Sequence, residues 1–322
     1  MGVGVTETVP NDLAARYLPP PEPTRRDDGA RHHRDAVYAA VPGYRVLELD
    51  LWVPAAPSPA PVVVWVHGGA WMAGNRRLLP PGLRPGQLVE ELLAAGLAMA
   101  TIEYRHAREA PFPAQLHDAK AAVRWLRHHA DELGLDAGRV GIAGESAGGH
   151  LAALVALTAD RPDLDGDVGV IGPSSAVAAV VDWYGVSSAE AMPRFAPPTE
   201  VAAVPPEALV PPLDVLLDGV DAATREAVSP VSHVSAGAPP FLLLHGTADT
   251  VVPYAQSELL ADALQGVGAD VRLEPVPGAQ HGWDGYPDAD AIVRRSVDFL
   301  AAALHRTVPV ARHSVDLWSG TP

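Results

Sequence analysis

Residues 140–157 read Val-Gly-Ile-Ala-Gly-Glu-Ser-Ala-Gly-Gly-His-Leu-Ala-Ala-Leu-Val-Ala-Leu. An apolar run of strand length comes first, then Gly144-Glu145-Ser146-Ala147-Gly148, then an apolar segment with the length of a helix. A serine placed between a strand and a helix, with a glycine two residues away on each side, is typical of a nucleophile elbow. Small neighbours permit the sharp turn, and a helix N-terminus favours negative charge beside the serine. We therefore predict that Ser146 is a catalytic nucleophile.

Strand and helix patterns alternate along the rest of the chain. Several apolar runs are continuous in Val, Ile and Leu, as expected for strands covered on both faces. Strand followed by helix, repeated, predicts an α/β fold with a mostly parallel sheet of about eight strands and helices on both faces. The expected strands are residues 36–40, 45–53, 62–66, 98–103, 140–143, 177–183, 241–245 and 271–276, and the expected helices are residues 87–95, 114–133, 148–159, 255–264 and 289–304.

One catalytic domain is expected, because 322 residues of which 48% are hydrophobic can bury one large core. Residues 1–35, rich in Pro, Arg and Asp, are predicted to form an extended N-terminal arm, with the domain over residues 36–305 and a C-terminal tail over residues 306–322. The alternation of strands and helices stops over about residues 187–235, which are rich in Pro and Ala. Connections this long inside a domain are often lids, so we predict a short cap, with a disordered insertion as the alternative.

Composition argues against several classes of function. A formal net charge of −16 disfavours nucleic-acid binding, and the absence of cysteine excludes disulfides and a thiol nucleophile. Since no apolar run approaches the ~18 residues of a membrane span and residues 1–35 do not resemble a signal peptide, we expect no membrane contact and a cytoplasmic location. Because the sequence has no His-Glu metal motif, we expect no metal site, and it also has no phosphate-binding glycine loop.

A serine hydroxyl becomes nucleophilic when a histidine, oriented by a carboxylate, takes its proton. Asp249 and His281 each lie in a loop that directly follows a predicted strand, and they follow Ser146 in the order serine, acid, histidine. Because loops after parallel strands meet at one edge of a sheet, we predict that these three side chains converge there. Asp182, within a strand pattern, and Asp284, close to the histidine in sequence, are the rival acids.

The reaction also needs hydrogen-bond donors for the oxyanion that forms on the substrate. The strand expected at residues 62–66 runs into His67-Gly68-Gly69-Ala70-Trp71, where glycines let backbone N–H groups approach a ligand closely. We predict an oxyanion hole formed by the N–H of Gly68 or Gly69, or both, together with the N–H of Ala147. His67 is expected to brace this loop through hydrogen bonds.

Four aromatic residues adjoin these loops and are candidate walls of a substrate pocket: Trp71, Trp183, Tyr184 and Trp283. The alternative is that they pack the rim of the core. An aromatic, apolar pocket suits an uncharged ester with a small or medium acyl group.

The chain resembles α/β-hydrolase esterases of the hormone-sensitive-lipase and feruloyl/acetyl-esterase-like groups. Residues 181–185 (Val-Asp-Trp-Tyr-Gly) are more similar to the feruloyl/acetyl-esterase-like branch, whereas the His-Gly-Gly-Ala loop departs from the His-Gly-Gly-Gly frequent in the other. The resemblance implies an α/β-hydrolase fold, a triad of Ser146, Asp249 and His281, and no cofactor. It is carried by residues 67–71, 104–105 (Tyr-Arg), 144–149, 245–249 (His-Gly-Thr-Ala-Asp) and 281–282 (His-Gly).

The sequence as a whole predicts a serine carboxylesterase that acts on small, uncharged ester molecules, with a homodimer left open. An amidase or formamidase, with a substrate such as N-formylkynurenine, would use the same residues. A biosynthetic acyltransferase or cyclase would use them while excluding water from the acyl-enzyme. A receptor that binds a ligand without catalysis is the alternative outside the enzymes.

Overall fold

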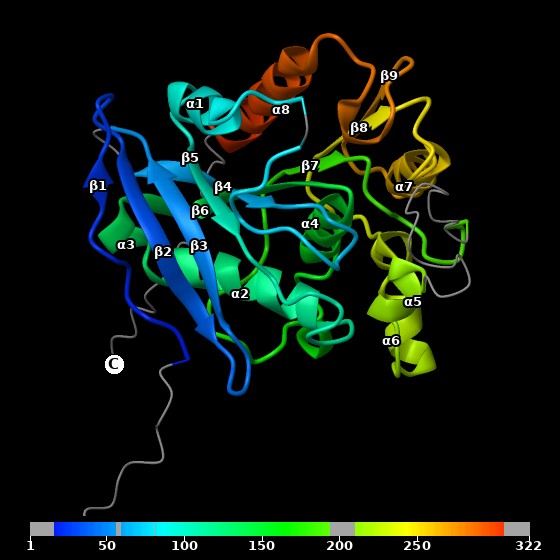
Figure 1. Ribbon diagram of the computed structural model, residues 1–322, viewed down its shortest axis with the longest axis horizontal. Helices are drawn as coiled ribbons and strands as arrows, with labels where there is room; N and C mark the ends of the chain where they lie inside the picture. The colour runs from blue at the N-terminus through cyan, green and yellow to red at the C-terminus, as the bar shows by residue number, and fades with distance from the viewer. Residues whose placement is uncertain (1–15, 56–58, 81, 194–209, 306–322) are drawn as a thin grey trace, which may run out of the picture.

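The computed structural model describes residues 16–55, 59–80, 82–193 and 210–305, which build a nine-stranded sheet (Figure 1). The strands are β1 (Thr24–Arg25), β2 (Arg31–Ala40), β3 (Val46–Val53), β4 (Ala60–Val66), β5 (Ala98–Ile102), β6 (Leu135–Glu145), β7 (Val180–Trp183), β8 (Phe241–Gly246) and β9 (Val271–Val276). Their order is β1-β2-β3-β5-β4-β6-β7-β8-β9. The pairs β1–β2, β2–β3 and β3–β5 are antiparallel, and the other five pairs are parallel. This mostly parallel sheet confirms the predicted α/β architecture.

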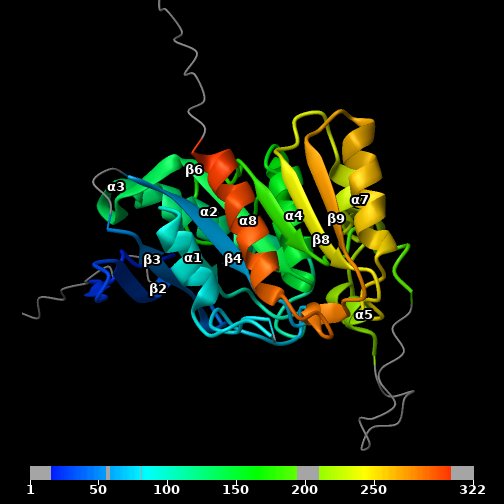
Figure 2. The same ribbon diagram turned by 90° about the horizontal axis from the view of Figure 1, so that it is seen from above.

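Helices cover both faces of the sheet (Figure 2). Side chains alternate between the faces along each strand, so in β4 Val62, Val64 and Val66 enter one core while Val63 and Trp65 enter the other. Helices α2, α4 and α7 pack on the first core, and α1 and α8 pack on the second. The longer helices are α1 (Gln87–Ala94), α2 (Ala114–His128), α4 (Ala147–Leu157), α7 (Ala255–Gly266) and α8 (Ala289–Leu304).

The sheet begins earlier in the chain than the sequence pattern predicts. Of the arm expected at residues 1–35, residues 1–15 lie outside the described residues. Residues 24–35 contain β1 and the first half of β2, so this part of the expected arm belongs to the sheet. These strands are antiparallel and lie at the edge of the sheet, where one face meets water and polar side chains are tolerated. The polar run Arg31-His32-His33-Arg34-Asp35 therefore resembles a solvated arm in sequence while pairing as a strand.

Element boundaries differ in two other places. The helix expected at residues 114–133 is divided into α2 and the short α3 (Ala130–Leu133), and β6 extends to Leu135, five residues before the predicted start. Gly134, in the left-handed conformation with φ 67°, ends α3 and turns the chain directly into β6. No helix among the described residues is both long enough and apolar enough to cross a lipid bilayer.

The segment expected to form a cap contains short helices in its described part. They are α5 (Pro212–Leu216), α6 (Ala222–Ala227) and the 3-10 helix η3 (Pro230–His233), and Figure 1 shows α5 and α6 outside the sheet near α7. Helix η3 contacts α4, α6 and α7. The segment is thereby packed at the end of the sheet where β6, β7 and β8 finish.

Candidate active site

Ser146 lies in the turn between β6 and α4. Its backbone has φ 52° and ψ −119°, a conformation rare for residues other than glycine. The Ser146 N–H donates to the Trp183 carbonyl at 2.8 Å, which ties the turn to the end of β7. A Cβ atom on Gly148 would lie 2.1 Å from the Val66 carbonyl oxygen, so a side chain there would push α4 away from β4. The turn is thus the sharp elbow that the Gly-x-Ser-x-Gly pattern predicts.

The structure brings Ser146, Asp249 and His281 together at the C-terminal edge of the sheet. His281, in the 3-10 helix η4 (His281–Trp283) after β9, has Nε2 3.0 Å from Ser146 Oγ. Its Nδ1 is 2.7 Å from Oδ2 of Asp249, which lies in the loop after β8. When Nδ1–H donates to the carboxylate, Nε2 is free to accept the serine proton. This is the relay required for a nucleophilic serine.

Asp249 is held as a carboxylate by its surroundings. Its Oδ1 accepts hydrogen bonds from the backbone N–H groups of Val251 at 2.8 Å and Val252 at 2.9 Å, which leaves Oδ2 for His281. Burial by itself raises the pKa of Asp249, but hydrogen bonds from His245 and His281 outweigh burial and hold the pKa well below its ordinary range. A group with a lowered pKa stays charged until strongly acidic pH, so the carboxylate is ionised at neutral pH.

The rival acids and His245 have other surroundings. Asp182 is buried in β7, where its Oδ1 accepts from the Gly185 N–H at 2.8 Å and burial raises its pKa to about 6. Asp284 is exposed beyond η4. His245 bonds to Ser257 Oγ at 2.7 Å and to the Val252 carbonyl at 2.9 Å, with Asp249 Oδ2 3.5 Å away. His245 therefore supports the loop that carries Asp249.

The predicted oxyanion donors lie in the loop after β4, residues 67–77, here called the β4 loop. Gly69, Ala70 and Trp71 have φ values of 108°, 53° and 57°, three successive left-handed residues. The Gly68 N–H points to Glu145 Oε1 at 3.4 Å and so turns away from the site. The N–H groups of Gly69, Ala70 and Ala147 have no acceptor within the described residues, and Ala70 and Ala147 line the cavity described below. The sequence pattern did not point to Ala70 as an oxyanion donor.

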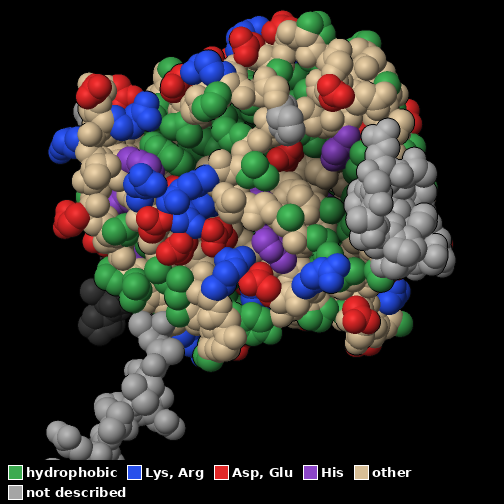
Figure 3. Space-filling view, viewed as in Figure 1, with side chains coloured by type: hydrophobic (Ala, Val, Ile, Leu, Met, Phe, Trp, Pro, Cys, Tyr) green, Lys and Arg blue, Asp and Glu red, His purple; other side chains and the backbone are tan. Residues whose placement is uncertain are grey.

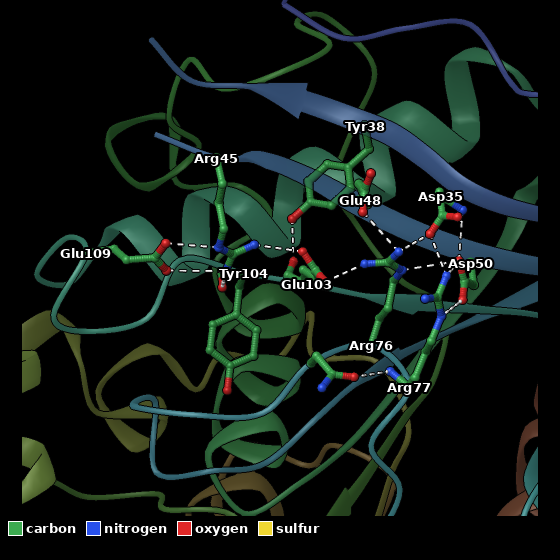
Figure 4. A network of polar contacts seen from close by, with 11 residues as sticks. Asp35, Tyr38, Arg45, Glu48, Asp50, Arg76, Arg77, Glu103, Tyr104 and Glu109 are labelled. Atoms are coloured by element: carbon green, nitrogen blue, oxygen red, sulfur yellow. Dashed lines mark hydrogen bonds and ion pairs between the residues drawn. The ribbon is translucent and has the colours of Figure 1, made fainter. Parts of the chain in front are cut away.

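A cluster of ion pairs holds the far end of the β4 loop (Figure 4). The Arg76 side chain, 7% exposed, pairs with Asp35, Glu48, Asp50 and Glu103, which come from β2, β3 and the end of β5. Arg77, Arg45 and Glu109 extend the cluster. Figure 3 shows the mixed basic and acidic patch on the surface over these strands. The cluster fixes a strained loop to the antiparallel part of the sheet.

Replacing Arg76→Met is expected to lower the free energy of unfolding by up to about 3–5 kcal/mol, because Glu48 would lose its cationic partner and the buried Asp50 would keep only Arg77, whose side chain is partly exposed. Chemical denaturation with urea measures this difference. Arg77→Met is the matched control, since its side chain is 45% exposed and its loss should cost no more than about 1 kcal/mol. Equal losses in the two variants would contradict this account of the cluster.

A cavity of about 730 Å³ opens beside Ser146. Its walls come from the elbow, the β4 loop, the expected cap and the loop after β8. Apolar side chains supply most of the wall, and Glu190, Asp214, Arg225 and Glu226 add charge on exposed positions. The apolar and small lining residues are Ala70, Trp71, Ala147, Val186, Ala189, Met192, Pro193, Pro211, Pro212, Leu213, Leu217, Ala222, Val231, Val251 and Val252.

Of the four aromatic residues proposed for the pocket, Trp71 lines the cavity and the other three do not. Trp183, Tyr184 and Trp283 are buried together in the core beneath the site, with the Trp283 ring 5.5 Å from Trp183 and 4.7 Å from Tyr184 between centroids. Trp183 Nε1 donates to Ser296 Oγ at 2.9 Å. These three residues therefore pack the rim of the core, as the alternative interpretation held.

Trp71 is joined to the expected cap through a buried histidine. Its Nε1–H donates to His150 Nδ1 at 3.2 Å, and His150 Nε2–H donates to the Val228 carbonyl at 2.7 Å. Burial lowers the pKa of His150 to about 4, so the ring is neutral and serves as acceptor on one side and donor on the other. The His150 side chain on α4 thus connects Trp71 of the β4 loop to Val228, which lies just before η3.

Comparison with known proteins identifies the family of this chain. The family model BD-FAE matches residues 49–264. Esterase LipC of Mycobacterium tuberculosis is 34% identical over 291 residues, which cover 85% of this chain and 67% of LipC. The chain therefore spans about two thirds of the length of LipC.

Two solved structures are similar over most of the chain. A truncated carbohydrate esterase from gut microbiota has a TM-score of 0.70 and 27% identity, covering 88% of this chain and 99% of that one. Esterase Est2 of the planctomycete Thermogutta terrifontis has a TM-score of 0.64 and 29% identity, covering 83% of this chain and 89% of that one. Sequence, fold and relatives agree that the chain belongs to the BD-FAE family of α/β-hydrolases and is a carboxylesterase-type hydrolase.

Proposed function

We propose that the chain cleaves carboxylic esters of small to medium uncharged substrates through an acyl-enzyme formed on Ser146. The observation that carries the proposal is the continuous relay from Ser146 through His281 to Asp249, opening into the cavity. Ser146 Oγ attacks the ester carbonyl carbon while His281 Nε2 takes the hydroxyl proton. Asp249 fixes the ring orientation and stabilises the imidazolium that forms.

The negative charge that develops on the carbonyl oxygen needs donors already in place. The N–H groups of Gly69, Ala70 and Ala147 are our candidates. The Gly68 N–H is not one of them, because it points to Glu145. As the tetrahedral intermediate collapses, the bond to the alcohol oxygen breaks and His281 returns its proton to the alcohol. Water then attacks the acyl carbon, His281 accepts the water proton, and the acid leaves as Ser146 regains its hydrogen.

The mostly apolar lining supports an uncharged acyl or alcohol group, and a structure of Est2 with propionate bound shows that this relative takes a short acid. The net charge of −16 supports the proposal that nucleic acid is not a partner. The cytoplasmic location and the homodimer stay predictions from the sequence.

We expect paraoxon to phosphorylate this protein in a one-to-one ratio, with the diethylphosphoryl group on the peptide that contains Ser146 in a mass spectrum. Est2 is phosphorylated by paraoxon in a solved structure. p-Nitrophenyl esters from acetate to decanoate should be hydrolysed, and the acetate should react about 100-fold faster than p-nitroacetanilide because an amine is the poorer leaving group.

Each alternative function gives a different result in these assays. A folded protein that paraoxon does not label would be a receptor. Faster turnover of the anilide or of a formamide than of esters would indicate an amidase. Acyl transfer to an added alcohol or amine in preference to water would indicate an acyltransferase.

A further inference from the structure

The carboxyl group of Glu145 is buried beside the nucleophile and has no role in the reaction described above. Glu145 is the last residue of β6 and is 7% exposed. Its polar partners in the described part of the chain are two donors, the Tyr184 hydroxyl and the Gly68 N–H. A buried carboxyl without a cationic partner is costly, so an apolar side chain would serve better if packing were its whole role.

One oxygen of Glu145 faces the β4 loop. Oε1 lies 3.4 Å from the Gly68 nitrogen, and a Cβ atom on Gly68 would lie 3.2 Å from both Cγ and Cδ of Glu145. The carboxyl group is therefore packed directly against this peptide. Because the Gly68 N–H is turned inward, the N–H groups of Gly69 and Ala70 are left for the cavity side of the loop.

The other oxygen of Glu145 faces Tyr184, whose ring packs against the imidazole of His281. The Tyr184 hydroxyl donates to Oε2 at 2.8 Å. The Tyr184 ring lies 4.6 Å from the His281 ring between centroids, at an angle of 57°. Tyr184 has φ 44°, a strained conformation for this residue, and a hydrogen bond at its far end helps to hold the ring in place.

Charge adds to this support. His281 is faced by Asp249 from the loop after β8, by Ser146 and Glu145 from the end of β6, and by the hydroxyl-bearing Tyr184 from the end of β7. Burial raises the pKa of Glu145, and the hydrogen bonds from Tyr184 and Gly68 oppose that rise. In its ionised form Glu145 adds a second negative charge near the imidazolium formed during the reaction.

We propose that Glu145 is a positioning residue for catalysis, which holds the oxyanion donors of the β4 loop with one oxygen and the Tyr184 ring against His281 with the other. This inference rests on the proposed function. It makes a residue of the Gly-x-Ser-x-Gly motif, one position before the nucleophile, the link between the two halves of the site.

The test compares Glu145→Gln with wild type in kcat, KM and the pH profile of kcat/KM. The amide keeps the size of the side chain but removes its charge, and its NH₂ group must face either the Gly68 N–H, which cannot accept, or the Tyr184 hydroxyl, which would have to accept instead of donate. We expect kcat to fall about 10- to 100-fold with KM within threefold, because misplacing donors affects the transition state more than the bound ester. The acidic limb of the profile should move to lower pH, since loss of a nearby negative charge disfavours the imidazolium.

Tyr184→Phe removes one hydrogen bond and keeps the ring, so we expect a smaller loss of about 3- to 10-fold in kcat. Glu145→Asp keeps the charge and should restore the position of the acidic limb. Ser296→Ala is the matched control: it removes the buried partner of Trp183 in the same aromatic core, and kcat should stay within twofold of wild type.

The proposal is overturned if Glu145→Gln, folded by its thermal unfolding curve, keeps kcat within twofold and leaves the pH profile in place. Should that variant not fold, Tyr184→Phe decides, and kcat within twofold of wild type in that variant would overturn the proposal. Paraoxon labelling separates this result from failure of the proposed function. If wild type is not labelled at Ser146, the proposed function fails, whereas labelled wild type with unaffected variants removes the role of Glu145 alone.

Discussion

Ser146→Ala is expected to lower kcat/KM for p-nitrophenyl acetate by at least about 10⁴-fold, because no acyl-enzyme can form without the hydroxyl. The residual rate would come from binding and from the oxyanion donors, which polarise the ester towards attack by water. The elbow should survive the change, since Ser146 makes no capping hydrogen bond with its side chain and its backbone N–H still reaches the Trp183 carbonyl. Thermal unfolding within a few degrees of wild type would verify this.

The same variant should not be labelled by paraoxon. Ser174→Ala, which changes an exposed serine remote in sequence from every motif, is the matched control and should keep wild-type turnover and labelling. A Ser146→Ala protein that hydrolyses esters within tenfold of the wild-type rate would show that another nucleophile, or directly activated water, carries the reaction.

Asp249→Asn is expected to lower kcat by about 10³- to 10⁴-fold while leaving the geometry of the site almost unchanged. The structure gives the reason. Oδ1 of Asp249 accepts two backbone N–H groups, from Val251 and Val252, so the oxygen of the new amide must occupy that position. Its NH₂ group then faces His281 Nδ1 and donates to it, which places the ring proton on Nε2 and leaves nothing to accept the serine proton.

The rate of paraoxon labelling should fall in parallel with kcat, because both reactions need the activated hydroxyl. Asp284→Asn provides the comparison, since Asp284 is an exposed carboxylate three residues from His281 and its loss should change kcat less than twofold. If Asp284→Asn proved as damaging as Asp249→Asn, the assignment of the acid would have to be reversed.

The sequence predicts those parts of the site in which a local pattern of residues determines where a side chain lies. A strand, a small-residue turn and a helix around Ser146 define the elbow, and the loops after two further strands carry Asp249 and His281 to the same edge. Parallel strands end on one side of a sheet, so order and strand context were enough to predict that these three residues meet. The alternation within β4 likewise predicts two cores.

What sequence could not supply depends on contacts between distant segments. Trp183 and Trp283 adjoin the motif loops in sequence, but their rings point into the core because β7 and η4 face α8 there. The inward turn of the Gly68 N–H depends on a carboxyl group 77 residues away, so Ala70 could not be ranked beside Gly69 as a donor. The polar start of β2 is a strand because β3 pairs with it, which its own composition does not reveal.

The hydrogen bonds from Trp71 through His150 to Val228 have a consequence for redesign of this enzyme. Exchanging the expected cap over the cavity is an obvious way to change which esters are accepted. Here the exchanged piece would carry the acceptor that fixes the His150 tautomer and, through it, the Trp71 indole beside the proposed oxyanion donors. We therefore expect selectivity and turnover to be coupled in this protein, so that a transplanted segment must bring a carbonyl group to the same place.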